Sequence, residues 1–142
     1  MSHYPKYSFD PATGIAKCEI MTKDGVKYIG TATCCNADAD MMSEKTGLII
    51  AESRAAVQAL RGEKARLQGE LSGLRSLYYS TNTSKHYNKK NYMERMLNRQ
   101  IKMRENDIAA IKAAIDHERN FLSDFIAEKD AFYQKVRSNR KV

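Results

Sequence analysis

The chain has 142 residues, the length of one domain at roughly 100–200 residues per domain. It carries 24 Lys and Arg against 17 Asp and Glu, a formal net charge of +7, and 42% of its residues are hydrophobic. This composition excludes collagen-like, mucin-like and wholly disordered chains. No apolar run approaches the roughly 18 residues of a membrane span, and the N-terminus has no apolar signal core. We therefore expect a soluble intracellular protein with no membrane partner.

The first part of the chain, residues 1–43, has the pattern of a small antiparallel sheet. Residues 10–14 (DPATG) have turn composition, and Asp24-Gly25 is a strong hairpin signal. Between them the sequence alternates, with Ala16, Cys18 and Ile20 on one face. We predict three strands in a meander, at residues 7–9, 15–23 and 26–35. A sheet this small needs a cover on its apolar face.

The three cysteines, Cys18, Cys34 and Cys35, make an odd number and form no C-x-x-C motif. Their spacing to histidines does not fit a zinc site, so we predict no metal. Reduced thiols packed in the sheet are the preferred interpretation, and a redox or metal role is the alternative.

The second part, residues 44–142, is predicted to be a helical hairpin. Apolar residues recur every three or four positions over several heptads in each half, which is typical of a coiled coil. The first seam contains Ile50, Val57, Leu60, Leu67, Leu71, Leu74 and Tyr78; the second contains Leu97, Ile101, Ile108, Ile111, Ile115, Leu122, Phe125, Phe132 and Val136. Polar residues 80–84 separate helices expected at about 44–79 and 91–137. The predicted fold class is α+β, with sheet and helix ends in one structural unit.

The lengths of the two helices differ. At 1.5 Å per residue they span roughly 54 and 70 Å, so the second helix extends beyond the first. The extension, residues 121–136, is rich in aromatic side chains. We expect it to cover the sheet.

A stripe of small residues follows the first helix. It contains Ala55, Ala59, Gly62, Gly69 and Gly73. Glycine inside a helix costs about 1 kcal/mol relative to alanine. The stripe favours close approach by a helix of another copy, and simple tolerance of glycine is the alternative.

Positive charge gathers at the predicted hairpin tip. Residues 85–104 hold seven Lys and Arg and one Glu, a local charge of +6. Tyrosines and asparagines are concentrated in the same region. Aromatic rings stack on bases, and Arg or Lys side chains bind phosphates. The tip therefore has the composition of a site for a nucleotide-like anion; the alternative is a solvated tip whose tyrosines hold the helix ends together.

No catalytic motif is found in the sequence. It lacks the Walker A, G-x-G-x-x-G, H-E-x-x-H and G-x-S-x-G patterns, and the three histidines lie far apart. The acidic residues between 107 and 130 fit a solvated helix face. We predict no enzymatic activity, no catalytic residues and no cofactor.

Two short motifs carry a resemblance. One is G-x-A-x-C in the last predicted strand, Gly30 to Cys34, and the other is G-x-x-x-A-x-x-R-A at the start of the helix, Gly47 to Ala55. With the long helical hairpin, this layout resembles the first type of Thoeris anti-defence protein, a family of phage-encoded sponges. The resemblance implies sequestration of cyclic ADP-ribose isomers without degradation, in the cytoplasm of an infected bacterium. It also implies a dimer or hexamer and a possible separate site for cyclic oligonucleotides.

Under this resemblance, the tip residues become candidate ligand contacts. Tyrosines would stack on the base, asparagines would contact base or ribose, and arginines would bind phosphates. The candidates are Arg75, Tyr78, Tyr79, Asn82, Tyr87, Asn88, Asn91, Tyr92, Arg95 and Arg99. Gly47 and Arg54 form a possible second anion site, with a surface salt bridge of Arg54 as the alternative.

Two other functions remain open. The chain could be an anti-CRISPR-like inhibitor that binds a protein of another bacterial immune complex. It could also be a phage accessory protein that binds nucleic acid through its tip and basic tail. The modest, local positive charge makes nucleic acid the weaker expectation, because nucleic-acid domains usually have a broad basic face.

Overall fold

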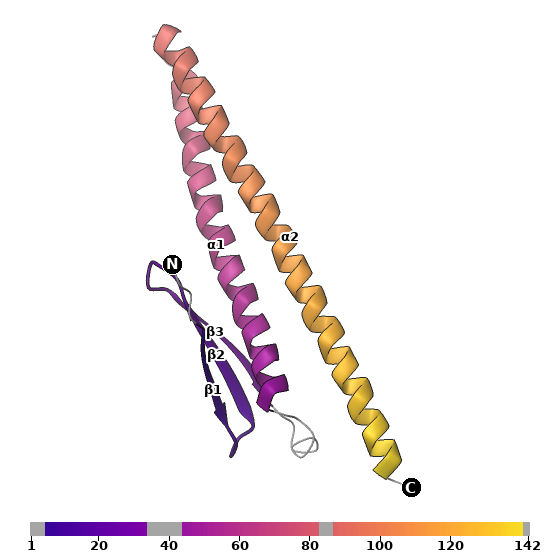
Figure 1. Ribbon diagram of the computed structural model, residues 1–142. Coiled ribbons are helices and arrows are strands. Elements are labelled where there is room, and N and C mark those ends of the chain that lie inside the picture. Colours follow the sequence, from indigo (N-terminus) through magenta and orange to yellow (C-terminus); the bar gives the residue numbers. More distant parts are fainter. Residues whose placement is uncertain (1–4, 34–43, 83–86, 141–142) are drawn as a thin grey trace. The chain divides into compact units, whose positions relative to one another are not determined.

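Figure 1 shows a computed structural model of the chain, which describes residues 5–33, 44–82 and 87–140. The elements follow in the order β1 (Lys6–Asp10), β2 (Ile15–Met21), β3 (Lys27–Thr33), α1 (Glu44–Asn82) and α2 (Tyr87–Arg140). The two long helices pack against each other, and the α+β fold predicted from the sequence is confirmed. The chain divides into two compact units, one formed by Met1–Ala59 with Ile115–Val142 and the other by Leu60–Ala114.

The sheet is an antiparallel meander in the order β1-β2-β3, as predicted. The first turn closes where the Gly14 N–H donates to the Asp10 carbonyl at 2.8 Å, and Gly14 has a φ of 72°. The hairpin between β2 and β3 has Gly25 at a φ of 81°. Both positions favour glycine because they lie in the left-handed region. Cys34 and Cys35, which we expected in the third strand, lie outside the described residues.

The core of the first unit joins the sheet to the start of α1. Ala16, Cys18 and Ala32 from the sheet pack with Ile50, Ala51 and Ala55 from α1, all buried. The burial of the free Cys18 thiol confirms the packing predicted for that residue.

Gly30 brings the sheet and α1 into very close contact. A Cβ atom built at Gly30 would lie 2.1 Å from the Ala51 carbonyl oxygen and 2.4 Å from the Ala55 nitrogen. Only a residue without a side chain allows two backbones to approach this far. The closest cover on the sheet therefore comes from α1. Ala55, which we had assigned to a stripe facing another copy, belongs to this core.

The end of α2 contributes less to this core than expected. Leu122, Phe125 and Ile126 pack against it while remaining partly exposed. Phe121 and Phe132 are 46% and 58% exposed, although the sequence pattern placed both in the cover of the sheet. The aromatic stretch instead makes contacts along its own helix, where Phe121 stacks on Phe125 and Phe132 meets Tyr133 edge-on.

The second unit is held together by the predicted seam. Leu67 and Leu71 from α1 and Ile108 from α2 are buried together, with Ile101 and Ile111 packed against them. Arg104, which interrupts the apolar pattern, donates from Nε to Glu70 Oε2 at 2.8 Å. In the first unit another interruption is paired the same way, because Ser53 Oγ donates to Glu118 Oε1 at 2.7 Å. Arg104 and Ser53 thus each have a partner on the opposite helix.

Both helices extend further toward the tip than predicted. α1 continues through the polar residues Ser80 and Thr81 to Asn82, and α2 already begins at Tyr87. Within the described ranges 5–33, 44–82 and 87–140, neither helix combines the length and apolar character needed to cross a bilayer.

Candidate ligand-binding groove

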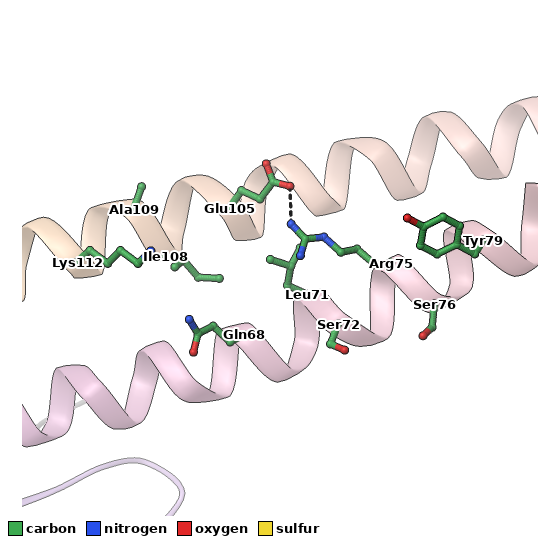
Figure 2. A pocket seen from close by; sticks show the side chains of 10 residues that line it. All are labelled: Gln68, Leu71, Ser72, Arg75, Ser76, Tyr79, Glu105, Ile108, Ala109 and Lys112. Carbon is green, nitrogen blue, oxygen red and sulfur yellow. Dashed lines mark hydrogen bonds and ion pairs between the residues drawn. The ribbon is translucent and has the colours of Figure 1, made fainter.

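A groove of about 680 Å³ runs between the two helices of the Leu60–Ala114 unit (Figure 2). Its floor is apolar, and most of its wall is polar. Gln68, Leu71, Ser72, Arg75, Ser76 and Tyr79 line it from α1, and Glu105, Ile108, Ala109 and Lys112 line it from α2. The lining residues recur every three or four positions, which places each set on one face of its helix.

The groove exists because small and long side chains alternate beside the seam. The buried Leu71 and Ile108 form the floor, where the helices are in contact. Ser72, Ser76 and Ala109 leave space directly beside that floor. Arg75 and Tyr79 extend along the opening (Figure 2). The result is an apolar base with cationic, aromatic and hydroxyl groups at its edge.

An ion pair crosses the groove. Arg75 Nη2 lies 3.2 Å from Glu105 Oε1, and the two side chains are 55% and 47% exposed. A pair this exposed contributes about 0–1 kcal/mol, because water screens it and two long side chains must be ordered. A phosphate group could therefore replace Glu105 as the partner of Arg75 at little cost. Lys112 adds a second positive charge to the same groove.

The structure brings together two of the residues predicted to contact a ligand, Arg75 and Tyr79. Tyr79 is 70% exposed. Tyr78 is half-buried and meets the Tyr79 ring edge-on, with centroids 6.3 Å apart. This contact limits where the Tyr79 ring can lie. Tyr78 therefore supports the Tyr79 ring, and the exposed Tyr79 ring is available for a ligand.

Other predicted contacts lie elsewhere on α2. Tyr92, Arg95 and Arg99 are exposed and do not line the groove. At 100° per residue, Arg99 points about 120° around the helix from Glu105. The backbones of Asn82, Tyr87, Asn88 and Asn91 belong to the helices, but their side chains lie outside the described residues.

The residues proposed for a second anion site lie near the start of α1. Gly47 is buried, and Arg54 is exposed. Arg54 Nη1 donates to the Thr31 carbonyl at 2.7 Å, which links α1 to β3. A guanidinium has five N–H donors, so this bond leaves others for solvent or a ligand. The interaction of Arg54 Nη1 is therefore a hydrogen bond to a backbone carbonyl and not the surface salt bridge given above as the alternative.

Sequence reasoning missed Gln68, Ser72, Ser76, Glu105 and Lys112 as groove residues. The missed signal is a polar row on α1 at positions 68, 72, 75, 76 and 79, directly beside the apolar seam. The positive charge and the tyrosines of the tip predicted a site at residues 85–104 instead.

A smaller apolar groove of about 370 Å³ lies in the first unit, between β1 and α1. Tyr7 lines it, and burial together with a hydrogen bond to Glu52 raises the pKa of its hydroxyl. Burial and the Glu52 charge also raise the pKa of the Cys18 thiol. A raised thiol pKa lowers the thiolate fraction at neutral pH, which favours a packing role for Cys18 over a reactive one.

Comparison of the sequence and structure with protein-family models, curated proteins and solved structures finds no match. Among the residues that the structure describes, no group of three or more His, Cys, Asp or Glu side chains could hold a metal ion.

Proposed function

We propose that this protein binds a small anionic nucleotide in the inter-helix groove and sequesters it without chemical change. The observation that carries the proposal is the placement of Arg75 and Tyr79 on one groove with Lys112. An aromatic face, a guanidinium and an ammonium are the groups that a base and its phosphates require.

The size and lining of the groove support a ligand of nucleotide size. Its volume of about 680 Å³ falls within the 300–1,000 Å³ of typical small-molecule sites. Ser72, Ser76 and Gln68 add hydroxyl and amide groups that can hydrogen-bond to ribose. Leu71 and Ile108 provide an apolar floor for a purine or a ribose edge.

The resemblance to Thoeris anti-defence proteins narrows the proposed ligand. We propose a cyclic ADP-ribose isomer, captured in the cytoplasm of an infected bacterium before it reaches its effector. Such a sponge needs a dissociation constant near 1 nM, which corresponds to about −12 kcal/mol. The groove is open on one side, so tight binding requires a lid. A second copy of the chain, in a dimer or hexamer, is the proposed lid.

The test is ligand capture by purified protein. The protein is incubated with cyclic ADP-ribose isomers and analysed by native mass spectrometry and thermal denaturation. A free ligand concentration of 1,000 times the dissociation constant stabilises the folded state by about 4 kcal/mol. The ligand should be recovered unaltered after heating, since the proposal includes no reaction. Degraded ligand, or no binding to any isomer, would overturn the proposal.

Two arginine variants locate the site. Arg75→Ala should abolish capture, whereas Arg99→Ala, which removes the same charge outside the groove, should retain it. The reverse result would move the site to the tip residues of α2. Oligonucleotide binding that weakens steeply with salt would instead support the nucleic-acid alternative.

A further inference from the structure

We infer that Glu105 is a specificity-determining residue of the groove. Its negative charge weakens the binding of nucleotides that carry more than two negative charges. This inference rests on the proposed function, because it concerns selection among nucleotides at the same site. Glu105 is the one carboxylate among the ten groove-lining residues, all of which the structure describes. It faces the cation best suited to bind a phosphate.

The charges of the groove nearly balance. Arg75 and Lys112 contribute two positive charges and Glu105 one negative charge, leaving +1. Cyclic ADP-ribose has one diphosphate and carries two negative charges. Each of its two phosphates can pair with one of the two cations. A triphosphate brings about two further charges, for which the ten described lining residues offer no additional cation.

Glu105 makes those further charges unfavourable. Its carboxylate is 3.2 Å from Arg75 Nη2, so a phosphate bound to Arg75 lies beside it. Glu105 can rotate away because its side chain is 47% exposed, but α2 keeps its charge near the groove. When a negative charge of the ligand lies about 8 Å from the Glu105 carboxylate in a water-like dielectric, the repulsion lowers the affinity about 2.4-fold for each such charge. Two additional charges then give about sixfold discrimination.

The same carboxylate is the ion-pair partner of Arg75 across the groove. Figure 2 shows the guanidinium reaching from α1 toward Glu105 on α2. A carboxylate at this position therefore orients the phosphate-binding group and limits the charge of what it binds. A glutamine would keep the shape and remove the negative charge.

The experiment compares Glu105→Gln with Asp107→Asn. Asp107 lies on α2 two residues further along and lines a different surface depression, with Glu63 and Arg66, so its variant removes the same charge away from the groove. Affinities for cyclic ADP-ribose and ATP are measured by calorimetry at low salt. Glu105→Gln should raise the affinity for ATP about sixfold more than that for cyclic ADP-ribose, and Asp107→Asn, whose charge lies farther from the groove, should change this ratio less. The difference should shrink at high salt, where screening is stronger.

The outcomes separate the two proposals. If the wild-type protein binds cyclic ADP-ribose and Glu105→Gln leaves the ratio to ATP unchanged, the role of Glu105 is overturned and the proposed function stands. If Asp107→Asn shifts the ratio as much as Glu105→Gln, the effect belongs to net charge, and the role of Glu105 is again overturned. If the wild-type protein binds neither nucleotide, both proposals fail.

Discussion

Adding one methyl group at Gly30 should remove much of the stability of the protein. The Cβ of Gly30→Ala would lie 2.1 Å from the Ala51 carbonyl oxygen and 2.4 Å from the Ala55 nitrogen. Both atoms belong to the backbone of α1, so no side-chain rotation relieves the clash. To reach an ordinary contact of 3.4 Å, helix and strand must separate by about 1.3 Å, the difference between 3.4 and 2.1 Å.

Separating β3 from α1 would weaken packing contacts across the whole core of the first unit. Ala16, Cys18 and Ala32 pack there with side chains of α1, and most of these are too small to fill a gap by rearranging. A gap of 0.5–1 Å already loses about a quarter to a half of the dispersion energy of a contact. Overpacking usually costs about 1–3 kcal/mol. Because the clash involves backbone on both sides, we expect a loss of about 3 kcal/mol or more.

Urea unfolding followed by circular dichroism at 222 nm measures this loss. Thr31→Ala is the matched control, because Thr31 is the next residue of β3, is exposed and keeps its carbonyl bond to Arg54. It should change the free energy of unfolding by about 0.5 kcal/mol or less. Adding Ala55→Gly should not rescue Gly30→Ala, since the Ala55 atom in the clash is its backbone nitrogen.

A loss below about 1 kcal/mol for Gly30→Ala would refute the reasoning, since it would mean that α1 does not lie against β3 at Gly30. If the variant is too unstable to purify in a folded form, unfolding can be measured in increasing sucrose, which favours the compact state. The wild-type protein and Thr31→Ala under the same conditions give the reference.

The sheet could be predicted because its signals are local. Gly14 and Gly25 mark the turns, and alternation over residues 15–21 identifies the buried face. The close approach at Gly30 was visible only as a missing side chain on that face. Its partner, the backbone of Ala51 and Ala55, follows from tertiary packing that no local pattern encodes.

The groove could be predicted only in part, because it depends on the register between two helices. The 3-4 spacing identifies the face on which each helix packs, and the buried Leu71 and Ile108 agree with it. It does not determine that Arg75 meets Glu105, 30 residues later. Arg75 and Tyr79 were selected for their chemistry near the tip. Their partner Lys112 lies on α2 well outside the basic cluster of residues 85–104, so composition could not identify it.

Three further predictions concern the helices. The hydrogen bond from Arg66 holds the pKa of Glu63 below the ordinary value of a glutamate. The contribution of this pair to stability is therefore present above that ordinary value and is lost as pH falls through the lowered pKa. Urea unfolding should show Glu63→Gln less stable than wild type at pH 7, with the difference disappearing in acid; a constant difference would contradict the pairing. Nothing lies within 4 Å of a Cβ added at Gly69, so Gly69→Ala should stabilise the isolated chain by about 1 kcal/mol. If another copy packs on this face, as the stripe of small residues predicts, the bulkier Gly69→Leu should lower the mass measured by light scattering while helicity is kept. An unchanged mass would place the interface elsewhere, because a leucine side chain cannot fit where two helix backbones are in contact.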